Sequence, residues 1–169
     1  MSAASPPESV PGFYERARRS LRGGGLPIGE AVHPVTLAAV LVLLVNDWVL
    51  KPRFGPSPVT GKLSDIAGLI ATPVLLSALI GLVLLLANKL GVRVAAPLTT
   101  RRLACCVAAT GLAFTAVKLS EHAATWFVRA VEVLGRPAEV YLDRTDLLCL
   151  PALAVTWWIG RDELRRQAM

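Results

Sequence analysis

Four apolar stretches follow one another along the chain, each bounded by charged or polar residues. They cover about residues 34–50, 66–87, 103–119 and 143–160. A helix needs roughly 17–25 predominantly apolar residues to cross the hydrocarbon layer of a bilayer, and the first three stretches lie within or close to that range. The pattern predicts an all-α fold, an integral membrane four-helix bundle.

The composition agrees with a chain whose solvent is lipid. Hydrophobic residues make up 54% of the 169 residues, charged residues 18%, and the mean hydropathy is +0.55. Such values are typical of membrane proteins. We predict a flexible basic arm (1–30), a membrane domain (31–160) and a cytoplasmic tail (161–169), with no separate soluble catalytic domain. The net charge of +6 does not indicate nucleic acid, because the basic residues flank the spans.

The distribution of basic residues predicts the orientation. An even number of spans places the arm, the loop between the second and third spans, and the tail on one side, and these segments hold 11 of the 18 Lys and Arg residues. The other side carries seven basic and seven acidic residues. Because cytoplasmic loops are enriched in Lys and Arg, we expect a multi-pass protein of a bacterial plasma (inner) membrane with both termini in the cytoplasm.

Polar residues gather at the span ends on the side with balanced charge. Asp47 and Lys51, Lys62 and Asp65, and Lys118 and Glu121 are close enough in sequence to predict ion pairs. Ionisable groups at membrane depth are costly, so they are usually paired or functional. The candidate ligand-binding residues are Asn46, Asp47, Lys51, Lys62, Ser64, Asp65, Lys118, Asp143, Arg144 and Asp146.

Two hydroxyl–Asp pairs, Ser64–Asp65 and Thr145–Asp146, stand at the predicted starts of the second and fourth spans. As helix caps, their oxygens would accept bonds from unpaired backbone N–H groups. As site residues, they would converge with the neighbouring lysines. Their similar placement indicates either two parallel helix-pair repeats or coincidence in an apolar sequence.

The two connections on this side predict different structures. Residues 51–62 contain three prolines and two glycines, which predict an ordered, non-helical connection. Residues 123–134 place apolar side chains on one helical face and Arg129 and Glu132 opposite, which predicts an extra interfacial helix. Trp48 and Trp126 near one boundary, with Trp157–Trp158 near the other, are typical of aromatic belts.

The residue types do not favour catalysis. Cys105, Cys106 and Cys149 lie in predicted spans without metal-ligand spacing, so we predict neither a metal nor a cofactor and assign no catalytic residue. A metal-dependent lipid-modifying enzyme would gather several Asp residues around Mg²⁺. The neighbouring lysines would instead neutralise those carboxylates, so an enzyme ranks third among the alternatives.

Several motifs resemble those of a set of small, uncharacterised four-span bacterial membrane proteins. More distantly, the layout resembles VanZ-like proteins, in which a Lys-containing motif opens the second span, an acidic group follows the third, and Arg and Asp open the fourth. Lys62, Asp65, Glu121, Arg144 and Asp146 match those positions, whereas the usual His of the first motif is absent. This likeness implies a connection with envelope lipids and glycopeptide-antibiotic tolerance. The motifs are Asn46–Asp47, Leu50–Lys51, residues 60–69, Asp143, residues 145–147 and residues 150–153.

Three functions remain open. The first is the binding or handling of an envelope lipid or small anion, with Lys and Arg holding a phosphate or carboxylate and Asp fixing their geometry. The second is a non-catalytic structural or partner-binding membrane subunit, in which Asp and Lys only fix helix register. The enzyme is the third. Membrane lipids are the expected partners, together with a second copy or another membrane protein, and the sequence determines neither the ligand nor the oligomeric state.

Overall fold

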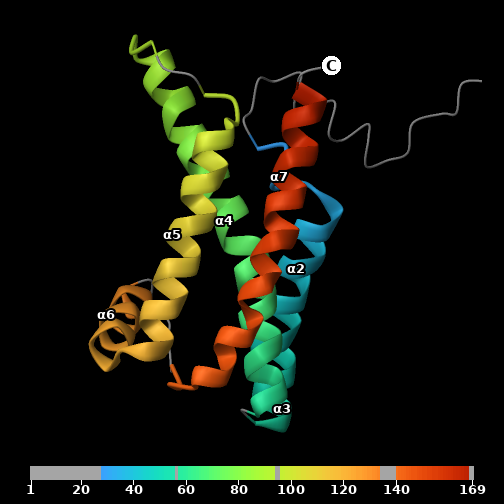
Figure 1. Ribbon diagram of the computed structural model, residues 1–169, viewed down its shortest axis with the longest axis vertical. Helices are drawn as coiled ribbons and strands as arrows, with labels where there is room; N and C mark the ends of the chain where they lie inside the picture. The colour runs from blue at the N-terminus through green and yellow to red at the C-terminus, as the bar shows by residue number, and fades with distance from the viewer. Residues whose placement is uncertain (1–27, 56, 94–95, 134–139, 168–169) are drawn as a thin grey trace, which may run out of the picture.

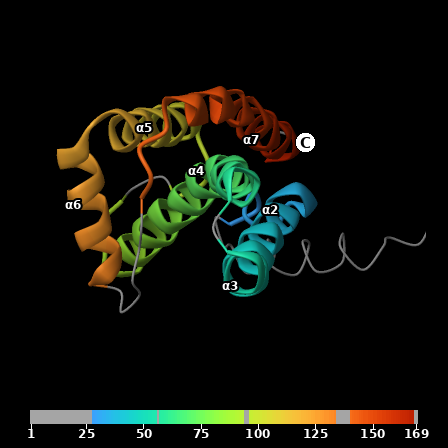
Figure 2. The ribbon, with the colours of Figure 1, turned by 90° about the horizontal axis from the view of Figure 1, so that it is seen from below.

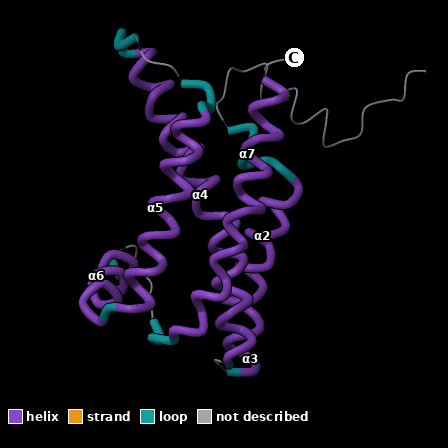
Figure 3. Tube along the Cα trace, in the orientation of Figure 1, coloured by secondary structure: helices purple, strands orange, loops and turns teal. Residues whose placement is uncertain are grey.

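The structure, a computed structural model, describes residues 28–55, 57–93, 96–133 and 140–167. Every regular element within these ranges is helical, and none is a strand (Figure 3). The all-α prediction is therefore confirmed. The predicted basic arm falls almost wholly outside the described residues.

Eight helical segments follow one another in the described parts of the chain. Helix α2 continues through the π-helical segment η1 into α3, so residues 34–54 form one continuous helix. Segment η2 is a 3₁₀-helix that leads directly into α7. The segments are α2 (Pro34–Val45), η1 (Asn46–Leu50), α3 (Lys51–Phe54), α4 (Pro58–Lys89), α5 (Thr100–Leu119), α6 (Glu121–Glu132), η2 (Arg144–Ala152) and α7 (Leu153–Gln167).

Three helices in the described residues are long and apolar enough to cross a membrane: Pro34–Phe54, Pro58–Lys89 and Thr100–Leu119. They indicate a membrane-embedded protein. Helix α7 is not among them: it has 15 residues, and its second half is charged from Arg161 onward. The predicted span at 143–160 corresponds to η2 and the first half of α7, and its crossing of the membrane stays a prediction.

Helix α4 is the central element, in contact with α2, α5, η2 and α7 (Figures 1 and 2). The end of α5, α3 and η2 lie together at one end of the bundle, which we call the α3 end (Figure 1). The start of α5 and the end of α7 lie at the opposite end. Helix α6 runs across the bundle rather than along it (Figure 2), as expected for the helix predicted at 123–134.

The predicted non-helical connection at 51–62 is wrong. Helix α4 begins at Pro58, where proline is favoured because its missing N–H needs no partner in the first turn. Ser57 caps the helix, and its side chain and that of Thr60 bond each other's backbone N–H groups in a capping box. Ser64 and Asp65 consequently lie inside α4, so their prediction as helix caps is also wrong.

The π-helical turn of η1 follows from Pro52. Proline has no N–H to donate to the carbonyl of Trp48 and its ring crowds that turn. The chain widens instead, and the Lys51 N–H bonds the carbonyl of Asn46, five residues earlier. This turn holds Asn46 against α4, where its side chain is fully buried.

A second proline, Pro73, interrupts α4 in mid-helix and leaves the carbonyl of Leu69 without its usual donor. The buried hydroxyl of Thr156 on α7 lies 3.2 Å from that carbonyl oxygen and 3.0 Å from the carbonyl oxygen of Ile70. Thr156 therefore repairs the interrupted hydrogen-bond ladder and joins α7 to α4.

This repair predicts an interaction between the two positions. Thr156→Val should lower the free energy of unfolding by about 1–3 kcal/mol, because it leaves a buried carbonyl unpaired. Pro73→Ala restores the backbone N–H that pairs with the Leu69 carbonyl. In that background, Thr156→Val should lower the free energy of unfolding clearly less. Unfolding of all four proteins in mixed micelles, followed by circular dichroism, measures the coupling. If Thr156→Val lowers the free energy of unfolding equally in both backgrounds, Thr156 does not replace the donor that Pro73 lacks.

A close contact between α5 and α7 predicts a second stability effect. A methyl group on Gly160 would overlap the side chain of Leu103, which is fully buried. Gly160→Ala should therefore lower stability by about 1–3 kcal/mol through overpacking. Gly68→Ala is the matched control, because open space surrounds that position; its thermal unfolding midpoint should stay the same or rise.

Candidate functional site

Lys118 of α5 connects three segments at the α3 end. Its Nζ lies 2.9 Å from Oδ2 of Asp65 on α4 and 2.6 Å from Oδ2 of Asp146 on η2. The side chains of Lys118, Asp65 and Asp146 are only 10%, 17% and 9% exposed. A cation shared by two largely buried carboxylates holds α5, α4 and η2 together at this end.

Lys62 reaches the same carboxylate from the more exposed side. Its Nζ lies 2.8 Å from Oδ1 of Asp146, 2.8 Å from the Thr145 hydroxyl oxygen and 3.6 Å from Oδ2 of Asp143. The Thr145 hydroxyl donates to Asp143 at 2.8 Å. We call Lys62, Asp65, Lys118, Asp143 and Asp146 the Lys–Asp network. Within it, Asp146 accepts a different lysine on each oxygen.

A separate group of polar residues joins α2 to α4. The Asn46 side-chain amide donates to the Thr60 carbonyl at 2.7 Å and to the Ser64 hydroxyl at 2.6 Å. The Ser64 hydroxyl donates to Oδ1 of Asp47 at 3.0 Å, and Lys51 pairs with the same oxygen at 2.7 Å. Asn46 is buried, whereas Asp47 and Lys51 are more than a third exposed. This group fixes the register of α2 against α4.

The structure changes the predicted pairs. Asp47–Lys51 is confirmed, as an i,i+4 pair on one helix face. Lys62–Asp65 is wrong, because Lys62 contacts η2 instead. Lys118–Glu121 is also wrong: α5 ends at Leu119, and the extended backbone of Ser120 turns α6 and its exposed Glu121 away.

The remaining predicted site residues take different positions. Asp143, not Thr145 or Asp146, caps η2, since its carboxylate accepts the Thr145 N–H at 2.8 Å. The prediction of Asp146 as a helix cap is therefore wrong. Arg144 is exposed, and no ion pair or hydrogen bond is recorded for it among the described residues. It is the free cation beside the network.

A second polar cluster lies at the opposite end and was not predicted as a site. Arg102 donates through Nε to the Ser77 hydroxyl at 3.2 Å and through Nη1 to the Ala96 carbonyl at 2.8 Å, and its Nη2 lies 3.8 Å from Oε1 of Glu30. Ser77 in turn donates to Glu30 at 2.8 Å. The sequence signal was Arg102 itself, one of the basic residues between the second and third predicted spans that were used only to predict the orientation.

Glu30 is the buried carboxylate of that cluster. Its side chain is 1% exposed, and Oε2 has no hydrogen-bond partner among the described residues. Burial raises the pKa of Glu30 above its usual range, and the hydrogen bond from Ser77 and the charge of Arg102 only partly oppose this. The equally buried Glu163 raises it further.

The chemistry of the Lys–Asp network is that of paired charges. No group of three or more His, Cys, Asp or Glu side chains among the described residues is arranged to hold a metal ion. Asp65, Asp143 and Asp146 each lie within 4 Å of a lysine instead. No protein-family profile, curated protein or solved structure matches the chain. The functional argument therefore rests on the geometry of this network.

Proposed function

We propose that this membrane-embedded chain binds a phosphate-bearing lipid headgroup or small anion at the α3 end, with Lys62 as the direct contact. The observation that carries the proposal is the sharing of Asp146 by two lysines. Lys118 binds one oxygen of Asp146 from the buried side, and Lys62 binds the other from the rim. The two cations therefore have different freedom to move.

The difference matters because separating a buried ion pair leaves a bare charge, which costs several kcal/mol. If Lys62 moves away, Asp146 still keeps its 2.6 Å contact with Lys118. The Lys62 side chain is 37% exposed, so solvent screens its own pairs and weakens them. Lys62 can thus exchange a carboxylate for an incoming phosphate at low cost, whereas Lys118 cannot.

Neighbouring groups complete an anion site. Arg144 precedes Thr145 in the chain and carries an exposed guanidinium, a group that binds phosphate oxygens in bidentate fashion. Together with Lys62 and Lys118, Arg144 balances the three carboxylates, so the site has no excess negative charge to repel an anion.

A structural or partner-binding subunit is the second candidate. The saturation of Lys118 and of both Asp146 oxygens favours it, because such contacts fix helix register without any ligand. The metal-dependent enzyme has no comparable support, since its candidate ligands are bound to lysines.

Native mass spectrometry of the gently solubilised chain tests the proposal. Wild type should retain a phospholipid or anion adduct, and Lys62→Ala should clearly lower its occupancy while keeping the free energy of unfolding within about 1 kcal/mol of wild type. Lys89→Ala is the matched control, because Lys89 is an exposed lysine at the opposite end of α4. That variant should retain the adduct.

Two results would contradict the proposal. One is an adduct of equal occupancy in wild type and Lys62→Ala, which would place the ligand elsewhere. The other is a bare wild-type protein whose Lys62→Ala variant aggregates, which would favour the structural subunit and direct the search toward protein partners.

A further inference from the structure

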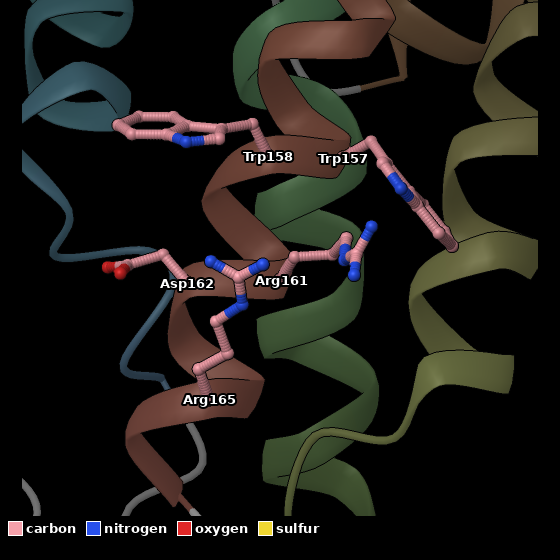
Figure 4. Close-up of a pocket in the computed structure, with 5 residues that line it drawn as sticks. All are labelled: Trp157, Trp158, Arg161, Asp162 and Arg165. Carbon is pink, nitrogen blue, oxygen red and sulfur yellow. The ribbon is translucent and has the colours of Figure 1, made fainter.

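A hollow of about 160 Å³ opens on the surface of α7, toward the end of the bundle opposite to the α3 end. It is lined by Trp157, Trp158, Arg161, Asp162 and Arg165. Figure 4 shows the two indoles spread to either side of α7, Trp158 toward α2 and Trp157 toward α5, with the guanidinium groups of Arg161 and Arg165 beneath them. The hollow thus has an aromatic wall and a cationic wall.

The cationic wall has no counter-ion of its own. Asp162 is the only carboxylate among the lining residues, and it is bound to Nε of Arg166 at 2.7 Å. Glu163 is buried on the other side of α7, where Gly29 lies against its carboxylate. Arg161 and Arg165 are exposed, and no ion pair is recorded for either among the described residues.

The spacing of the two guanidiniums favours an anion between them. Arg161 and Arg165 stand four residues apart on one helix face, where like charges destabilise the helix. An anion that binds both relieves this repulsion. Guanidinium groups match phosphate oxygens in geometry and are weakly hydrated, so a phosphate is the anion of choice.

The aromatic wall distinguishes between sources of that phosphate. The apolar part of α7 ends at Ile159 and Gly160, and charges begin at Arg161. Trp side chains at such a change from apolar to charged residues typically lie at the membrane–water interface. A free phosphate would contact only the arginines, whereas a phospholipid places its glycerol and upper acyl region against the indoles and its phosphate at the guanidiniums.

We propose that the hollow on α7 holds the headgroup of an anionic phospholipid. Trp157 and Trp158 flank its upper chains, and Arg161 and Arg165 bind its phosphate. This site shares no residue with the Lys–Asp network and lies at the other end of the bundle. The proposal can therefore be tested independently of ligand binding at Lys62.

Quenching of tryptophan fluorescence by brominated lipids tests the proposal. The full chain carries Trp48→Phe and Trp126→Phe, so that only Trp157 and Trp158 emit, and it is placed in micelles with brominated phosphatidylglycerol or brominated phosphatidylcholine. Phosphatidylglycerol should quench at about thirtyfold lower mole fraction, since the attractions of two basic residues at a membrane surface add up to that ratio.

Substitutions and a competitor complete the experiment. Arg161→Gln with Arg165→Gln should abolish the preference for phosphatidylglycerol while leaving quenching by phosphatidylcholine unchanged, which shows that the chain is still inserted. Arg53→Gln, at an exposed arginine of α3, and Lys62→Ala should keep the preference. Equal quenching by the two lipids, or a preference that survives loss of both arginines, would overturn the proposal. Loss of the preference on addition of inorganic phosphate would also overturn it, by showing a free-anion site.

Discussion

Lys118→Met should lower the free energy of unfolding by about 3–5 kcal/mol, the largest effect of any single change at the α3 end. The methionine fills a similar volume but leaves Asp65 without its cation, and that carboxylate is only 17% exposed. Asp146 loses its 2.6 Å contact but keeps Lys62. Equilibrium unfolding in mixed micelles, followed by circular dichroism, measures the loss.

The partner of Lys118 supplies the control. Adding Asp65→Asn to Lys118→Met removes the stranded charge and should restore at least half of the lost stability. Asp65→Asn alone should cost much less, since Lys118 keeps Asp146. If the double variant is as unstable as the sum of the two single variants, Asp65 and Lys118 are not coupled in the folded protein.

Arg102→Met should give the second largest effect, a loss of about 3 kcal/mol near neutral pH. The change removes the cation 3.8 Å from Glu30 in the cluster opposite to the α3 end. Burial already raises the pKa of Glu30, and without Arg102 that pKa should rise further.

The sign of the pH dependence follows from these shifts. A carboxyl group with a raised pKa binds protons more tightly in the folded than in the unfolded chain, so stability falls as pH rises through that interval. The loss of stability caused by Arg102→Met, relative to wild type, should therefore be small near about pH 4.5 and large near about pH 7.5. Thermal unfolding midpoints at both pH values measure it.

The negative charge of Glu163 also acts on Glu30, so a variant must show which carboxylate Arg102 stabilises. In a Glu30→Gln background, the effect of Arg102→Met should no longer depend on pH. If the loss of stability caused by Arg102→Met is the same at both pH values when Glu30 is present, Glu30 is not the group that Arg102 stabilises.

The long apolar helices could be predicted because the cost of burying polar groups in lipid acts on each segment separately. The stretches 66–87 and 103–119 lie inside α4 and α5. The early start of α4 also has a sequence signal, since Ser57, Pro58 and Thr60 form a capping arrangement. Interpreting the nearby prolines only as helix breakers hid that signal.

The convergence of Lys62, Asp65, Lys118 and Asp146 could be predicted, but their pairing could not. Lys62 and Asp65 are three residues apart, yet Lys62 contacts Asp146, 84 residues away. Partner choice depends on how η2 and α5 pack on α4, and sequence spacing carries no information on that distance. Arg102 was interpreted as one more basic residue at a span end for the same reason: its partner Glu30 lies on a different segment.

The most direct test of the account is whether Lys62, and not Lys118, responds to ligand. The chain contains four lysines, so their ¹⁵Nζ signals can be assigned with Lys62→Arg and Lys118→Arg variants. Titration with short-chain phosphatidylglycerol should shift the Lys62 signal saturably while the Lys118 signal stays in place. An unchanged Lys62 signal, or equal shifts of both lysine signals, would contradict the account, in which Lys62 exchanges its carboxylate for the ligand and Lys118 stays bound to Asp146.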